Sequence, residues 1–346
     1  MKKIIAMLLI FALLAALSAC KTASPEVSEP ASEPVSEPAS EPAAASEDPA
    51  DDVTVRVASL KGPTSMGLVK LMEDCAAEDS AVKCEFTVAG SADEITPKFI
   101  QGDFDIVSVP ANLASVLWNR TEGKVKVLAI NTLGVLYIVA KNETVNSVAD
   151  LRGKTIYATG KGSTPEYGIK KLLELNGLDP ETDVTFEWKS QPDEVVPVLK
   201  TSESAVAMLP QPYVTAAMAN VEGLEVKLSL NDEWNKFPEN GMFITSVIAV
   251  NSDFAAAHPR AVEEFMRAAA ESCEYAVTDV AATAALVEKY VGIKTAVAQK
   301  ALPQCNITFV SGSEMKSALA GYLGVLYGYE PKSVGGNLPG DGFYYE

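Results

Sequence analysis

The sequence predicts an α/β protein with two similar lobes, each a mixed sheet flanked by helices. From Val53 onward, β-like stretches alternate with stretches that have the three- and four-residue apolar spacing of helices. This alternation starts at 53–60 and restarts at 155–159, each time with a strand, a glycine-containing polar loop and a helix. Alternating strands and helices favour parallel or mixed sheets covered by helices, so each run is expected to form one lobe.

The elements of the first run follow one another without a long linker. They are expected to be strand 53–60, helix 64–77, strand 84–90, helix 93–101, strand 104–110 and helix 111–120. The second run is expected to contain strand 155–159, helix 165–176, strand 184–190, helix 192–201, strand 204–210 and a helix from Gln211. Val262, Phe265, Met266, Ala269 and Cys273 share one face of a later helix.

Two long apolar stretches, 134–140 and 243–250, are expected to carry the crossings between the lobes. The first lobe is therefore expected to comprise 53–137 and 247–346, with a helical C-terminal segment returning to it. The second lobe is expected to comprise 138–246, and the two are expected to face each other across a cleft.

The N-terminus has the pattern of an export signal over residues 1–19. Lys2 and Lys3 precede an apolar run that is short for a bilayer span. The sequence "LSAC" (Leu17–Cys20) resembles the bacterial lipobox, which predicts a lipid on Cys20; the alternative is a plain secretory signal. Residues 20–52 hold the lipidated cysteine and a Ser-Glu-Pro repeat with nine acidic residues, expected to be a disordered tether.

The net charge of the chain is −18, so a basic surface for nucleic acid or anionic lipid is not expected. Four further cysteines favour two disulfides in an exported protein, and the expected pairs are Cys75–Cys84 and Cys273–Cys305. Buried free thiols are the alternative. The chain has no Cys-x-x-Cys, so neither a metal nor a cofactor is expected.

The loop "KGPTSMG" (Lys61–Gly67) has the glycine spacing of a phosphate-binding loop. Leu68 and Val69 stand where that loop needs lysine and a hydroxyl residue, which excludes nucleotide hydrolysis here. What remains is a helix start with Thr64 or Ser65 as N-cap and free backbone N–H groups. The second run repeats this arrangement in "GKGSTPE" (Gly160–Glu166), again with a lysine beside the glycines.

Paired loops of this kind lie at the carboxyl ends of strands, where open α/β sheets bind ligands. A second pair, "VPANLASVLW" and "LPQPYVTAA", reads strand, proline, short polar element, helix. Asn112, Gln211 and Tyr213 could donate hydrogen bonds, and Tyr213, Tyr137 or Trp118 could supply a stacking surface. The expected ligand-binding residues are Lys61, Gly62, Pro63, Thr64, Ser65, Met66, Pro110, Ala111, Asn112, Tyr137, Gly160, Lys161, Gly162, Ser163, Thr164, Gln211 and Tyr213.

Catalytic groups are sparse. His258 is the only histidine and begins "HPR", which is typical of a helix start, so a Ser-His-Asp site or a histidine metal cluster is not expected. We therefore expect a binding protein without catalytic residues.

Several stretches resemble the solute-binding lipoproteins of ABC importers, in the nitrate/sulfonate/taurine and thiamine-precursor-like group with the type II periplasmic-binding-protein fold. They are "GDFDIVSVPANLASVLWN", "VADLRGKTIYATGKGSTPEYG", "AMLPQPYVT", "ALPQCNITFV" and "PKSVGGNLP". The resemblance implies two lobes that close on one ligand. It also implies cleft-facing loops at Lys61–Met66, Pro110–Asn112, Gly160–Pro165 and Gln211–Tyr213.

By that resemblance the partners are a small polar or anionic organic solute and an ABC permease with its ATPase. The membrane is reached through the lipid on Cys20, no nucleic acid is bound, and the protein is a monomer. It is expected on the outer face of the cell membrane or in the periplasm. The alternatives are a ligand sensor for a membrane receptor and an extracellular enzyme. One relative of the group makes a thiamine pyrimidine, but its Cys-rich motif is missing here.

Overall fold

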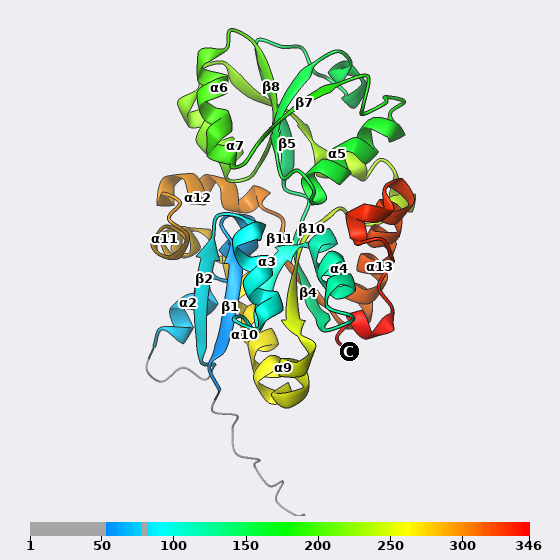
Figure 1. The fold of residues 1–346 in the computed structure, drawn as a ribbon. Coiled ribbons are helices and arrows are strands. Elements are labelled where there is room, and N and C mark those ends of the chain that lie inside the picture. The colour runs from blue at the N-terminus through cyan, green and yellow to red at the C-terminus, as the bar shows by residue number, and fades with distance from the viewer. Residues whose placement is uncertain (1–52, 78–81) are drawn as a thin grey trace, which may run out of the picture. The chain divides into compact units, whose positions relative to one another are not determined.

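The computed structural model describes residues 53–77 and 82–346, all within one compact unit, Pro49–Glu346. The expected signal peptide, the lipidated Cys20 and the acidic tether lie outside the described residues. Two sheets are each flanked by helices (Figure 1), which confirms the predicted α/β class. We call each sheet with its flanking helices a lobe.

The first lobe is built on a six-stranded mixed sheet with the order β11-β4-β10-β3-β1-β2. β1 is parallel to both β2 and β3, whereas β10 is antiparallel to β3 and β4, and β11 is antiparallel to β4. The strands are β1 (Val55–Leu60), β2 (Cys84–Ala89), β3 (Ile106–Pro110), β4 (Val125–Leu133), β10 (Ile244–Asn251) and β11 (Ile307–Ser311).

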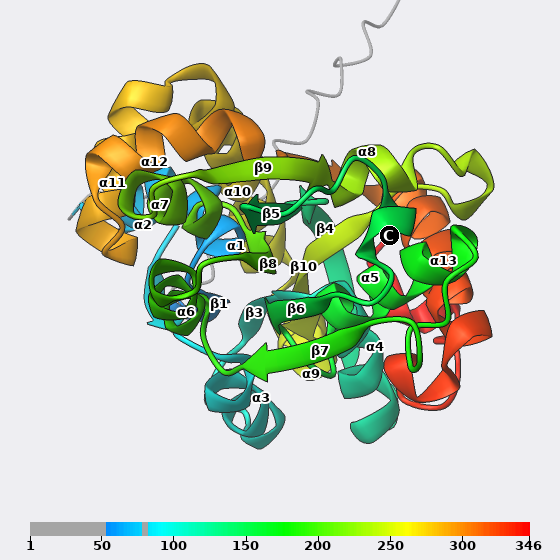
Figure 2. The same ribbon diagram turned by 90° about the horizontal axis from the view of Figure 1, so that it is seen from above.

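The second lobe has a five-stranded sheet with the order β7-β6-β8-β5-β9. β6 is parallel to β7 and β8, while β5 is antiparallel to β8 and β9. The strands are β5 (Leu136–Lys141), β6 (Thr155–Thr159), β7 (Thr185–Lys189), β8 (Ala205–Pro210) and β9 (Leu224–Ser229). Figure 2 shows this sheet from above, with β7 and β9 at its two edges.

Helices connect these strands and form the C-terminal segment. The α-helices are α1 (Pro63–Met66), α2 (Val69–Cys75), α3 (Ala92–Gln101), α4 (Ala111–Arg120), α5 (Thr164–Leu175), α6 (Val195–Thr201), α7 (Tyr213–Asn220), α8 (Leu230–Trp234), α9 (Ser252–Ala257), α10 (Pro259–Thr278), α11 (Val280–Val291), α12 (Thr295–Ala301) and α13 (Gly312–Tyr329). The 3-10 helices are η1 (Val148–Leu151), η2 (Pro192–Glu194), η3 (Pro238–Asn240), η4 (Leu302–Gln304), η5 (Pro331–Val334) and η6 (Asp341–Phe343).

The chain crosses between the sheets a few residues earlier than the sequence suggests. Tyr137 lies in β5 and pairs within the second sheet, while Ile244 already pairs within the first. Gly134 sits between β4 and β5, and a Cβ there would come within 2.7 Å of the Phe243 ring. The two crossings therefore pack directly against each other, and glycine permits that approach.

Apolar side chains cover both faces of the first sheet. The expected inward face of α10 is confirmed, since Val262, Phe265 and Ala269 are fully buried. On the other face, α13 brings Tyr322 against Trp234 and Phe243, which stack with ring centroids 4.9 Å apart. This aromatic cluster joins the second lobe to the C-terminal segment, because Trp234 follows β9 and Tyr322 lies in α13.

The structure corrects the expected disulfides, since none of the four described cysteines is in a disulfide. Cys273 and Cys305 are buried in the core, and the Cys305 thiol donates a hydrogen bond to the carbonyl oxygen of Ala301. Cys75 and Cys84 do lie side by side, and their contact, with burial, raises the pKa of Cys84. The sequence therefore predicted the contact between Cys75 and Cys84 but not its chemical state.

Within 53–77 and 82–346, the structure contains no helix whose length and hydropathy would let it span a membrane.

Candidate functional site

The first predicted loop follows β1, but its helix start differs from the prediction. Gly62, with φ of 123°, is the N-cap of α1, and neither Thr64 nor Ser65 caps the helix. The Ser65 hydroxyl instead donates to the carbonyl oxygen of Leu60 at 2.6 Å, and Met66 is a fully buried core residue. α1 has four residues, and α2 begins separately at Val69, so the expected single helix is divided.

Asn131 holds this loop against the strands, which the sequence prediction missed. Its amide donates to the carbonyl oxygen of Thr64 at 3.1 Å and to the Ser108 hydroxyl at 2.9 Å. Its carbonyl oxygen accepts from the Ser246 hydroxyl at 2.9 Å. An asparagine within the apolar stretch 125–140 was the sequence signal for this buried network.

The second predicted loop, between β6 and α5, is closed by its own helix. Gly160 has φ of 84°, and a Cβ there would lie 2.6 Å from Pro165. The Ser163 hydroxyl donates to the carbonyl oxygen of Gly160, and the backbone N–H of Gly162 donates to the Glu166 carboxylate at 2.6 Å. Glu166, which the sequence prediction did not include, is only 7% exposed. Its carboxylate accepts the hydrogen bond of a backbone N–H that was expected to be open to a ligand.

The two lobes meet through Asn112 and Thr164. Asn112 lies in the first turn of α4, and its amide donates to the carbonyl oxygen of Ser333 at 2.9 Å. Its carbonyl oxygen accepts from the Thr164 hydroxyl of α5 at 3.2 Å. Tyr322 lies beside Thr164; burial raises the pKa of Tyr322, and the contact with the Thr164 hydroxyl opposes that effect.

A second junction is centred on Gln304 of η4, a residue that the prediction also missed. The Gln211 amide donates to the Gln304 side-chain oxygen at 2.7 Å, and the Tyr137 hydroxyl donates to the Gln304 backbone oxygen at 3.1 Å. Gln211 also accepts from the backbone N–H and the hydroxyl of Thr215. Burial raises the pKa of Tyr137 to about 12, so its hydroxyl stays protonated as a donor at neutral pH.

Not every predicted residue reaches these junctions. Lys61 and Lys161 are exposed on the surface. Trp118, a candidate stacking surface, packs edge-on against Phe343 at 5.7 Å within the first lobe. Tyr213 is half-buried at the start of α7, where burial raises its pKa.

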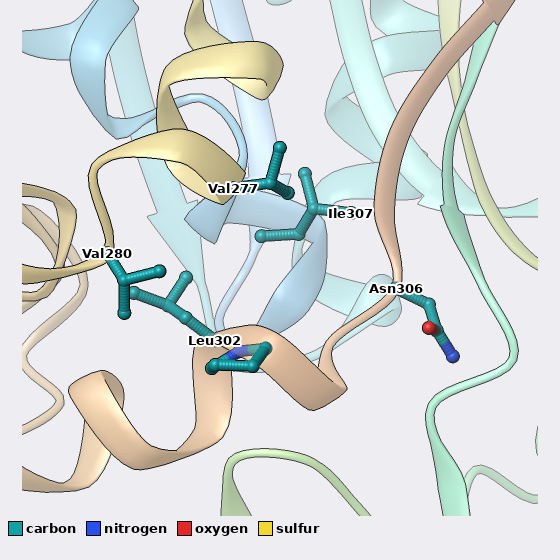
Figure 3. A pocket seen from close by; sticks show the side chains of 6 residues that line it. Val277, Val280, Leu302, Asn306 and Ile307 are labelled. Carbon is teal, nitrogen blue, oxygen red and sulfur yellow. The ribbon is translucent and has the colours of Figure 1, made fainter.

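The described part of the chain contains a pocket of about 420 Å³ beside η4. Val277, Val280, Leu302 and Ile307 form its apolar walls (Figure 3), while the Asn306 amide points away and donates to the carbonyl oxygen of Gly134. None of the predicted ligand-binding residues lines it. Across the residues that the structure places, no three His, Cys, Asp or Glu side chains gather as a metal site.

Comparison with known proteins supports the relationship predicted from sequence. Residues 125–281 match the NMT1/THI5-like family model. The region covers β4 to the start of α11 and so includes both crossings and the whole second lobe. A Brucella abortus (strain 2308) protein named as a binding protein is 26% identical over 180 residues, which are 52% of this chain. The chain spans about half the length of the curated relatives it matches, 54% in this case.

Solved structures show the same fold. An ABC transporter protein from Parabacteroides distasonis is 24% identical with a TM-score of 0.71, over 85% of this chain and 99% of that one. The periplasmic aliphatic sulphonate binding protein SsuA from Escherichia coli is 16% identical with a TM-score of 0.67, over 85% of this chain and 92% of that one. The fold is that of two-lobe periplasmic binding proteins.

Proposed function

We propose that the protein captures one small organic solute between its two lobes and delivers it to an ABC permease. The observation that carries the proposal is the meeting of neutral polar side chains from both lobes. Asn112 reaches Thr164, and Gln304 reaches Gln211 and Tyr137. Asn112, Thr164 and Gln211 follow the ends of β3, β6 and β8, where open α/β sheets bind ligands. All five groups connect lobes that are linked by two crossings.

The proposed ligand contacts come from loops that end β1, β3, β6 and β8. The first turn of α4 supports this assignment, since it has no side-chain cap and no acidic residue. Its backbone N–H groups are suited to a ligand carbonyl or hydroxyl oxygen. Closure of the lobes would bury these donors around the solute, which increases the strength of each hydrogen bond.

Attachment to a membrane is part of the proposal and rests on the sequence of the N-terminus. Processing at "LSAC" would leave a lipid on Cys20, and residues 21–52 would tether the folded body near the permease. The test is the fractionation of a lipidating bacterial host that expresses the full chain. Wild-type protein is expected with membranes and Cys20→Ser in the soluble or secreted fraction; wild type found only in that fraction would reject the lipid anchor.

Binding is tested by calorimetry and by melting of the purified protein against a panel of small solutes. A ligand bound only by the folded state raises its stability by RT ln(1 + [L]/Kd), so a true ligand gives a saturable shift with one-to-one stoichiometry. Gln211→Ala should weaken that binding, because Gln211 joins the lobes. The matched control is Gln101→Ala, which changes an exposed glutamine at the end of α3 and leaves Gln211 and Gln304 intact.

A further inference from the structure

The start of α5 already holds a negative charge. The Glu166 carboxylate accepts the Gly162 N–H at 2.6 Å, at the position where a bound anion would gain most from the helix dipole. The Glu166 side chain is 10% exposed, so water screens this charge only weakly. An anion arriving at this loop would meet a like charge instead of free N–H groups.

The neighbouring lysine does not cancel this charge. Lys170 contacts Glu166 at 2.9 Å and Glu181 at 2.8 Å, so one cation is shared between two carboxylates. Burial lowers the pKa of Lys170, but its hydrogen bonds to Glu181 and Glu166 outweigh that effect and raise it. The group therefore contains two carboxylates and one ammonium, so acidic groups outnumber basic ones beside the loop.

The other polar groups at the lobe junctions are uncharged amides and hydroxyls. Thr164 lies in the same loop as Glu166 and donates to Asn112, and the fully buried Tyr322 hydroxyl lies beside Thr164. Neutral donors and acceptors suit a neutral solute, because a buried anion needs a cation or several converging N–H groups.

We infer that the solute bound between the lobes is uncharged and that Glu166 makes the site reject anions. This inference rests on the proposed function and names the ligand class of the same site. It separates the protein from the sulphonate binding protein described above. Lys61 and Lys161, which the sequence placed beside the loops, are exposed on the surface, whereas the cation in contact with Glu166 is Lys170, which Glu181 shares.

The test measures anion binding to the full-length protein by calorimetry and melting at constant ionic strength. The probes are methanesulfonate and nitrate, with methanesulfonamide as the uncharged analogue. Glu166→Gln removes the charge but keeps an oxygen that can accept the Gly162 N–H. Glu174→Gln is the matched control, since Glu174 lies on the same helix with its side chain 41% exposed beside Lys171.

Wild type and Glu174→Gln should show no saturable binding of either anion. Glu166→Gln should bind methanesulfonate saturably at concentrations at least about tenfold below those at which wild type shows no saturation, since a unit charge a few ångströms away is removed. The affinity for methanesulfonamide should be the same in wild type and Glu166→Gln. Glu166→Ala, which vacates the Gly162 N–H altogether, serves as the second variant if Glu166→Gln does not fold.

Saturable one-to-one binding of methanesulfonate or nitrate by wild type would overturn the inference. Folded Glu166→Gln and Glu166→Ala proteins that bind the anions no better than Glu174→Gln would overturn it as well. A different result would contradict the proposed function, namely that no solute binds the wild type one-to-one. The two failures are therefore distinguishable.

Discussion

The hydrogen bond between Thr164 and Asn112 should couple the two lobes energetically. Both side chains are at most 1% exposed, and the Thr164 hydroxyl lies 3.2 Å from the Asn112 oxygen. Thr164→Val keeps the shape but leaves that oxygen without its donor, at a cost of about 1–2 kcal/mol. Asn112→Ala also strips the Ser333 carbonyl of its partner and should cost about 2–4 kcal/mol.

Urea unfolding of the wild type, both single variants and the double variant measures the coupling. Tryptophan fluorescence is a suitable probe, since Trp234 is fully buried in the aromatic cluster with Tyr322. We expect a coupling energy of about 1 kcal/mol between the two positions. Thr215→Val, which loses a hydrogen bond within the second lobe, should add to Asn112→Ala without coupling. A Thr164–Asn112 coupling below about 0.3 kcal/mol would refute the contact.

Three further predictions concern packing, pH and thiol reactivity. Gly168→Ala should destabilise the fold by about 1–2 kcal/mol in chemical unfolding, because its Cβ would lie 2.6 Å from the buried Phe243 ring; a gain in stability would contradict this packing. The pKa of Glu143 is lowered, chiefly by its hydrogen bond to Lys154. The contribution of this pair to folding stability is therefore complete above the ordinary pKa of 4.5 and is lost as pH falls below it. The melting temperature of wild type should therefore fall more steeply between pH 5 and about 3 than that of Glu143→Gln, and equal slopes would count against the pair. Burial raises the pKa of Cys273 to about 12, so it should react with a disulfide reagent at neutral pH only after unfolding, and rapid labelling of the folded protein would reject its burial.

The sequence predicted the α/β class and most strands because their apolar residues follow a strong local pattern. The inward faces of α5 and α10 were also predictable, because the apolar residues of each helix recur at three- and four-residue spacing. Ile169 in α5 and Phe265 in α10 are examples, and both are fully buried. The crossings were misplaced by a few residues because β4 and β5 form one continuous apolar stretch around Gly134. Only strand pairing, a long-range property, separates Tyr137 from the first sheet.

The candidate site was predicted less completely, because its contacts join residues far apart in the chain. The loops containing Asn112, Thr164 and Gln211 were identified by the pattern of strand, polar turn and helix. Gln304 was missed, since its contact with Gln211 spans 93 positions and has no local pattern. Glu166 had a local signal, as an acidic residue in the first turn of α5, but sequence did not reveal that its carboxylate closes its own loop.

The measurement that tests capture of a solute most directly is native mass spectrometry of the full-length protein purified under gentle conditions. The account predicts a single small molecule per chain, released on denaturation, and lost or depleted in the Asn112→Ala protein when that variant is folded. Extraction should identify the molecule as uncharged at neutral pH. A protein that carries no solute and gains none from extracts of its own host would contradict the proposal that the two lobes form a solute-binding site.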